Sequence, residues 1–129
     1  MTSYANASEQ LPDFEISYRF LSIAEGGRDW TPYQHYRCDW SYEGDDIAKT
    51  GIYMIWPEFL AADGSIFPND IPVPAEGFAT MWIVSPEMRS LIHCQRIKVG
   101  VKGHFMEGRR QVAEAIVAGV IGLHSFSDS

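Results

Sequence analysis

The feature that most constrains the fold of this chain is an alternation of apolar and polar side chains with a period of two. Between Phe14 and Phe20 every second side chain is aromatic or aliphatic, and the side chains between them are polar. A strand with one buried and one wet face has this pattern, because its successive side chains point to opposite faces. Further stretches that favour strands lie at 36–42, 51–56, 77–84, 96–101 and 111–124. Together they predict about six strands and no long helix, which is an all-β domain.

The last of these stretches, residues 111–124, fits two interpretations. Val112, Ala115 and Ile116 have the spacing of a helical stripe. The β-branched residues and the glycines of the same segment disfavour a helix and favour a strand. The residues alone therefore lean toward a strand without excluding the helix.

Prolines mark the longest interruption of the pattern. The apolar run 51–56 is expected to stop at Pro57, and residues 57–76 contain four of the seven prolines. Compact domains rarely carry a connection of this length without a function for it. We expect an irregular loop here.

Length and composition predict one domain. A chain of 129 residues with 46% hydrophobic residues can bury a stable core without a metal or a disulfide. We expect a flexible leader at 1–12, one domain at 13–124 and a flexible tail at 125–129. The N-terminus lacks the basic and apolar regions of a secretory signal, and no apolar run is long enough to span a membrane. Two cysteines fit a reducing compartment, so we expect a cytoplasmic protein.

The charge distribution limits the partners. The formal net charge of −7 disfavours non-specific binding to phosphate backbones. Six of the ten basic residues nevertheless lie between Arg89 and Arg110. This basic corner could steer an anionic partner, although ordinary solvated strand faces are the favoured explanation.

Motifs of the common catalytic sites do not occur in the sequence. It has no G-x-x-x-x-G-K-[ST] loop for nucleotide phosphates, no G-x-S-x-G elbow and no H-E-x-x-H. His35 with Cys38 and His93 with Cys94 have odd spacings, which place side chains on opposite faces of a strand. We therefore expect no enzyme activity, no cofactor, no bound nucleotide and no metal site.

Several segments resemble, in order, the C-terminal β-barrel domain of elongation factor Tu. The first is Glu25-Gly26-Gly27-Arg28, followed by Thr31-Pro32 and Tyr36-Arg37; Tyr18-Arg19-Phe20-Leu21 leads into it. The later ones are Phe67-Pro68-Asn69-Asp70, Ile83-Val84-Ser85-Pro86, Arg96-Ile97-Lys98-Val99, Glu107-Gly108-Arg109-Arg110-Gln111-Val112 and Ile116-Val117-Ala118-Gly119-Val120-Ile121. The resemblance as a whole covers residues 14 to 123.

The resemblance implies a closed antiparallel β-barrel of about six strands in which residues 111–121 form the last strand. In the elongation factors this domain follows a GTPase domain and helps to hold the T-stem of aminoacyl-tRNA. We expect a free-standing relative of this domain in a bacterial, translation-related protein without GTPase activity. Departures from the family pattern include Cys38, Asp39 and Arg109; a carboxylate at position 39 repels phosphate.

The function that these observations predict is a non-catalytic binding module. A protein partner is favoured because of the net negative charge, and tRNA or ribosome-associated RNA is the alternative. The expected contact residues lie in one loop, in the second strand and along a basic rim: Arg28, Trp30, Tyr33, Arg37, Lys98, Lys102, Arg109 and Arg110. The other tryptophans are expected to fill the core.

Overall fold

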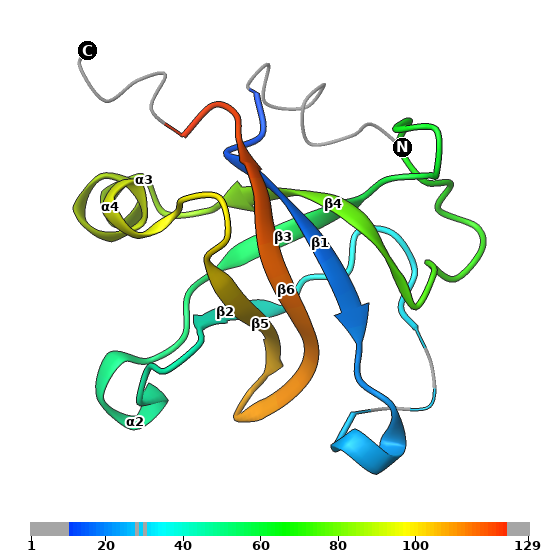
Figure 1. Ribbon diagram of the computed structural model, residues 1–129, viewed down its shortest axis with the longest axis horizontal. Coiled ribbons are helices and arrows are strands. Elements are labelled where there is room, and N and C mark those ends of the chain that lie inside the picture. The colour runs from blue at the N-terminus through cyan, green and yellow to red at the C-terminus, as the bar shows by residue number, and fades with distance from the viewer. Residues whose placement is uncertain (1–10, 28, 30, 124–129) are drawn as a thin grey trace.

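The computed structural model describes residues 11–27, 29 and 31–123 (Figure 1). The expected leader and tail therefore lie almost wholly outside the described residues, as do Arg28 and Trp30. Within the described residues six antiparallel strands form one strongly curled, open sheet, in the order β2-β5-β6-β1-β4-β3. The strands are β1 (Phe14–Phe20), β2 (Asp39–Tyr42), β3 (Ile55–Phe59), β4 (Glu76–Ile83), β5 (Lys102–Glu107) and β6 (Arg110–Val120).

Most of the predicted strands are present. The prediction for Phe14–Phe20 is confirmed at both ends, and β4 agrees with the predicted 77–84 within one residue. The ambiguous last segment is a strand, β6, and its antiparallel pairing with both β1 and β5 satisfies its backbone. This pairing outweighs the helical spacing of its apolar residues.

Two predicted strand positions are wrong. Residues 96–101 form the end of a helical segment and a turn, and the strand begins only at Lys102. Strand β3 begins at Ile55 instead of Gly51, and it runs through Pro57 to Phe59 instead of stopping at the proline. A proline is tolerated there because β3 is an edge strand of the sheet, where one backbone N–H is not needed for pairing.

A helical segment between β4 and β5 was not predicted. It comprises α3 (Pro86–Met88), the π-helical turn η2 (Arg89–His93) and α4 (Cys94–Arg96). Ser85 caps its start by accepting a hydrogen bond from the Met88 backbone N–H, and Pro86 occupies the first turn. Both are ordinary start signals of a helix. Two shorter elements are η1 (Ile23–Glu25) and α2 (Ile47–Thr50).

This helical segment is anchored to the sheet by a buried ion pair. Arg89 Nε donates to Asp13 Oδ1 at 2.6 Å, and the other carboxylate oxygen of Asp13 accepts from the Ile83 backbone N–H. Asp13 is only 5% exposed. Breaking such a pair on one side leaves a buried charge, so the contact fixes the segment to the start of β1.

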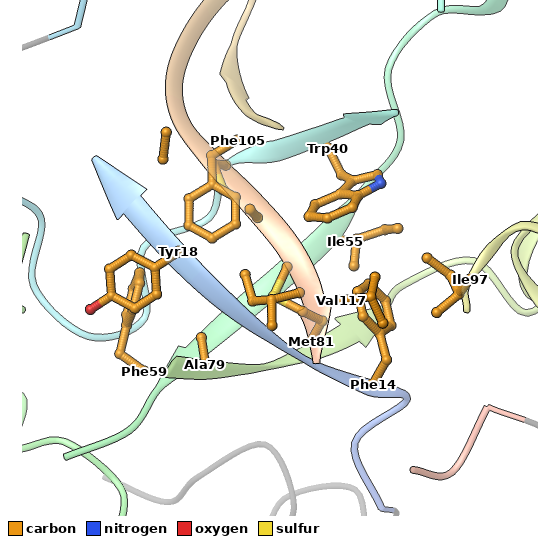
Figure 2. Close-up of a cluster of buried hydrophobic side chains, with 14 of the residues drawn as sticks. Phe14, Tyr18, Trp40, Ile55, Phe59, Ala79, Met81, Ile97, Phe105 and Val117 are labelled. Carbon is orange, nitrogen blue, oxygen red and sulfur yellow. The ribbon is translucent and has the colours of Figure 1, made fainter. Parts of the chain in front are cut away.

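The core lies inside the curl of the sheet and is rich in aromatic rings (Figure 2). Tyr18 and Phe59 meet edge to face with ring centroids 5.2 Å apart, and Phe14 and Trp40 do so at 5.7 Å. Such contacts add to the free energy gained by burying the rings. The labelled core residues in Figure 2 come from all six strands and from the end of the helical segment: Phe14, Tyr18, Trp40, Ile55, Phe59, Ala79, Met81, Ile97, Phe105 and Val117.

The two edge strands β2 and β3 curl toward each other and leave a seam between them. Trp40 in β2 and Tyr53, just before β3, exchange two backbone hydrogen bonds at 2.8 Å. Among the residues that the structure describes, this bridge is the one backbone pairing between the two edge strands. The expected closed barrel is therefore an open, barrel-like sheet whose edges touch at one bridge.

A side chain takes over the pairing at the other end of the seam. Continuing the antiparallel register of the Trp40–Tyr53 bridge places Gln34 opposite Phe59. The Gln34 side-chain amide accepts from the Phe59 backbone N–H at 2.7 Å and donates to the Phe59 carbonyl at 2.9 Å. It thus makes the two hydrogen bonds that a strand residue would make at this position.

Pro57 cannot take part in a backbone ladder across the seam between these two points. In the same register Pro57 faces Tyr36, and a paired residue at this position would have to donate a backbone N–H. Proline has none. The Tyr36 hydroxyl donates instead to Glu107 at the end of β5. The chain near position 36 is thus held by side chains rather than by a strand ladder.

Candidate functional site

The outer face of the sheet carries a row of four paired residues that crosses four strands, here called the apolar row after its two large members, Ile116 and Phe78. Ser17 in β1 pairs with Phe78 in β4 on one side and with Ile116 in β6 on the other, and Ile116 pairs with Lys102 in β5. Because the intervening residues of each strand point into the core, these four side chains lie together on the solvent side. The row therefore reads Lys102, Ile116, Ser17, Phe78.

Two members of this row are large, apolar and exposed. Phe78 is 51% exposed and Ile116 is 44% exposed, whereas the outer face of such a sheet is normally polar. Ser17 between them is small, so the row has a gap at its centre. Neighbouring exposed apolar side chains of this kind mark interaction surfaces more often than single ones do.

A charged row runs parallel to the apolar row. Arg19 in β1 pairs in register with Glu76 in β4 and with Glu114 in β6, and Glu114 pairs with His104 in β5. Arg19 donates to Glu114 at 2.9 Å and, through two nitrogens, to Glu25 at 2.9 and 2.8 Å. These hydrogen bonds lower the pKa of Glu25 to about 2 and raise that of Arg19. Arg19 is thus already engaged by two carboxylates.

Both rows line a cleft of about 560 Å³, here called the outer-face cleft. Its wall also includes Glu43, whose backbone N–H donates to the Lys102 carbonyl where β2 ends beside β5. A hollow of this size accommodates a few side chains of a partner. Among the described residues, no three His, Cys, Asp or Glu side chains are grouped closely enough to hold a metal ion.

The predicted basic rim is divided between two ends of the sheet. Lys102 begins β5, and Lys98 lies in the turn before it, whereas Arg109 and Arg110 lie beyond the other end of β5. The five steps from Lys102 to Glu107 correspond to about 16 Å. The structure therefore does not bring all of these cations to one edge.

Arg110 has a structural role at its end of the sheet. Its side chain donates to the backbone carbonyls of Gly26 and Gly27, at 3.0 and 3.3 Å. This contact joins the turn after β1 to the β5–β6 hairpin, so two segments of the resemblance lie side by side. Arg109 is exposed and lines a separate hollow of about 360 Å³ that also contains Glu25 and Asp45.

The predicted loop residues that the structure describes are Tyr33 and Arg37. Tyr33 is exposed and lines a hollow of about 450 Å³ together with neighbouring loop residues and Pro72. The Arg37 guanidinium lies over the Trp56 ring, 4.4 Å from its centroid, which is a cation–π contact. Arg28 and Trp30, the other two residues of the predicted surface, lie outside the described residues.

A buried polar cluster that the sequence analysis did not predict lies between β2 and the helical segment. The His93 side chain is fully buried, and its Nδ1 is 2.6 Å from the Tyr42 hydroxyl. Arg96 lies over the Tyr42 ring and pairs through two nitrogens with Asp45. Burial and the nearby Arg96 charge lower the pKa of His93 to about 4. Because this neutral histidine is inaccessible to solvent, the cluster contributes to stability rather than to a ligand site.

Both cysteines are free thiols in the structure. Cys38 is almost fully buried, and burial raises the pKa of its thiol well above the ordinary value. A nucleophilic cysteine needs the opposite shift and access to substrate.

No protein-family model and no curated protein matches this chain. Among the described residues, none of the helices is both long enough and apolar enough to span a bilayer. The site is therefore interpreted from its own geometry.

Proposed function

We propose that this chain is a non-catalytic module that binds a protein partner through the outer-face cleft. The observation that carries the proposal is the apolar row, in which Phe78 and Ile116 are exposed on either side of Ser17. Protein interfaces are built around such apolar centres with charged rims. Here Arg19, Glu76 and Glu114 provide that rim.

Electrostatics favours a protein partner over RNA. The outer-face cleft is lined by three carboxylates, on Glu43, Glu76 and Glu114, and by two cations, Arg19 and Lys102. Arg19 is already paired with Glu25 and Glu114. RNA binding, the alternative function, would use the residues of the predicted basic rim and would need them to line one groove. The described candidates for that role are divided between two ends of β5, and Arg110 is engaged by backbone carbonyls.

We further propose that the fold is a variant of the C-terminal barrel of elongation factor Tu. Its supporting observation is the contact between the Gly26–Gly27 turn and Arg110, because both segments belong to the resemblance. In this variant the barrel stays open, and its two edges meet at the Trp40–Tyr53 bridge and at the Gln34 amide. The two free thiols fit a proposed location in the reducing cytoplasm.

Site-specific photo-crosslinking tests the proposed function. A photoreactive phenylalanine analogue replaces Phe78 in one variant and Ile66 in the control; Ile66 is similarly exposed, at 48%, but belongs to the loop after β3. In lysate of the source organism we expect a protein adduct from position 78 that survives RNase and does not form from position 66. An adduct that RNase removes, or equal adducts from both positions, would contradict the proposal.

A further inference from the structure

We infer that the partner inserts a long cationic side chain, of arginine or lysine, into the gap above Ser17. This inference rests on the proposed function and specifies the chemistry of the partner. The aliphatic stem would lie between Phe78 and Ile116, and the charged head would face the carboxylates of the rim. The occupant is thus a basic segment of another protein.

The shape of the gap supports a long, thin side chain. Ser17 is in register with Phe78 on one side and with Ile116 on the other, so a small residue separates two large apolar ones on adjacent strands. Neighbouring strands lie about 4.8 Å apart, so the two flanking side chains are about 10 Å apart at their bases. One extended side chain therefore fits between them and contacts both.

The charges around the gap select a cation. Glu76 lies two residues before Phe78 in β4, and Glu114 lies two residues before Ile116 in β6. Two residues along a strand return to the same face, which places Glu76 and Glu114 beside the apolar row. Arg19 is bonded to Glu25 and Glu114, and Lys102 is the second cation of the cleft. The four carboxylates of Glu25, Glu43, Glu76 and Glu114 therefore outnumber the two cations, and the surroundings of the gap keep a negative charge.

Amphipathic side chains match this combination better than purely apolar ones. Lysine and arginine bury their methylene stems on apolar surface and keep the charged end near water or carboxylates. A cation beside the exposed ring of Phe78 also gains a cation–π interaction. An acidic side chain in the same place would be repelled by Glu76 and Glu114.

The test is a selection from a phage-displayed library of random twelve-residue peptides against the whole chain. Each selected clone is then measured against two matched variants. Ser17→Arg fills the gap with a cation from the chain itself, and Ala62→Arg adds the same charge at an exposed position of the loop after β3. Thermal melting of both variants verifies that they fold.

We expect the selected peptides to be enriched in arginine and lysine and to lose at least tenfold in affinity on Ser17→Arg, but not on Ala62→Arg. We also expect Glu76→Gln to weaken these peptides and to reduce the salt dependence of their binding. Peptides that depend on Ser17 but show no enrichment in basic residues would overturn this inference and leave the proposed function intact. A selection in which no peptide depends on Ser17 would overturn both.

Discussion

The side-chain amide of Gln34 occupies the place of a strand residue opposite Phe59. It accepts from the Phe59 backbone N–H, donates to the Phe59 carbonyl, and donates also to the Phe67 carbonyl at 3.0 Å. Gln34 is only 7% exposed. One buried side chain therefore closes an edge of the sheet and holds the loop after β3 against it.

Replacing Gln34 by alanine should destabilise the domain. The buried N–H of Phe59 would lose its acceptor, and leaving such a group unsatisfied costs about 1–3 kcal/mol. We expect the free energy of unfolding, measured by urea denaturation, to fall by about 2 kcal/mol. The control is Gln95→Ala on the exposed side of α4, which should change it by less than about 0.5 kcal/mol. Equal effects of the two substitutions would show that the Gln34 amide is not structural.

Gly103 in β5 should not tolerate a side chain. A Cβ at this position would lie 2.2 Å from Cζ2 of Trp40, whose ring is fully buried. The ring cannot move away without displacing the core, so we expect Gly103→Ala to lower the free energy of unfolding by about 3 kcal/mol. Gly119→Ala in β6 is the matched control, because apart from the adjoining residues of the chain no atom lies within 4 Å of the place that its methyl group would take. Calorimetric melting of the two variants measures the difference.

Strand periodicity was the part of the fold that the sequence predicted well. β1 and β4 alternate regularly because one face of each is buried and the other is wet, and both were placed within a residue. The helical segment was missed although Ser85 and Pro86 are start signals for a helix. Its middle is a π-helical turn, which disturbs the spacing of apolar residues on which the prediction depends.

The candidate site was harder to predict because it depends on register. Phe78 and Ile116 were each recognised as strand residues, but nothing local indicates that Ser17 lies between them. The basic rim was predicted from closeness in sequence, and β5 separates its members along its length. The role of Gln34 could not be foreseen either, because it depends on the open edge of β3, where the Phe59 backbone needs a partner distant in sequence.

The domain should lose stability in acid through His93. Its pKa in the fold is about 4, below the ordinary value of 6.5, so the unfolded chain binds the proton more readily. The contribution of the neutral His93 side chain to the free energy of unfolding is fully present above about pH 6.5. It is lost as the pH falls toward about 4, and the loss reaches about 3 kcal/mol at most.

Urea denaturation between pH 4 and 7 measures this effect. We expect the free energy of unfolding of the wild type to rise with pH over this range, and the rise to be shallower in His93→Gln. An NMR titration of the imidazole should place the His93 pKa near 4. Identical pH dependence of the two proteins would contradict the assignment.

The Asp13–Arg89 pair should matter more than the exposed pair of Arg19 and Glu114. Asp13→Ala removes the carboxylate that the largely buried Arg89 guanidinium bonds. We expect the free energy of unfolding to fall by about 3 kcal/mol. Glu114→Ala breaks an exposed ion pair, which is worth at most about 1 kcal/mol. Amide hydrogen exchange should show the loss of protection in residues 85–96 of the Asp13 variant first.

The most direct test of the central claim is the affinity of the crosslinked partner for two sets of variants. Phe78→Ser combined with Ile116→Ser removes the apolar row, and both side chains are about half exposed, so the fold should persist. Arg109→Glu inverts the charge of the predicted rim at an exposed position. We expect the double variant to lose at least tenfold in affinity, as central interface residues do, and Arg109→Glu to change it less than twofold. Full affinity in the double variant, with a loss in Arg109→Glu, would contradict the outer-face cleft as the binding surface.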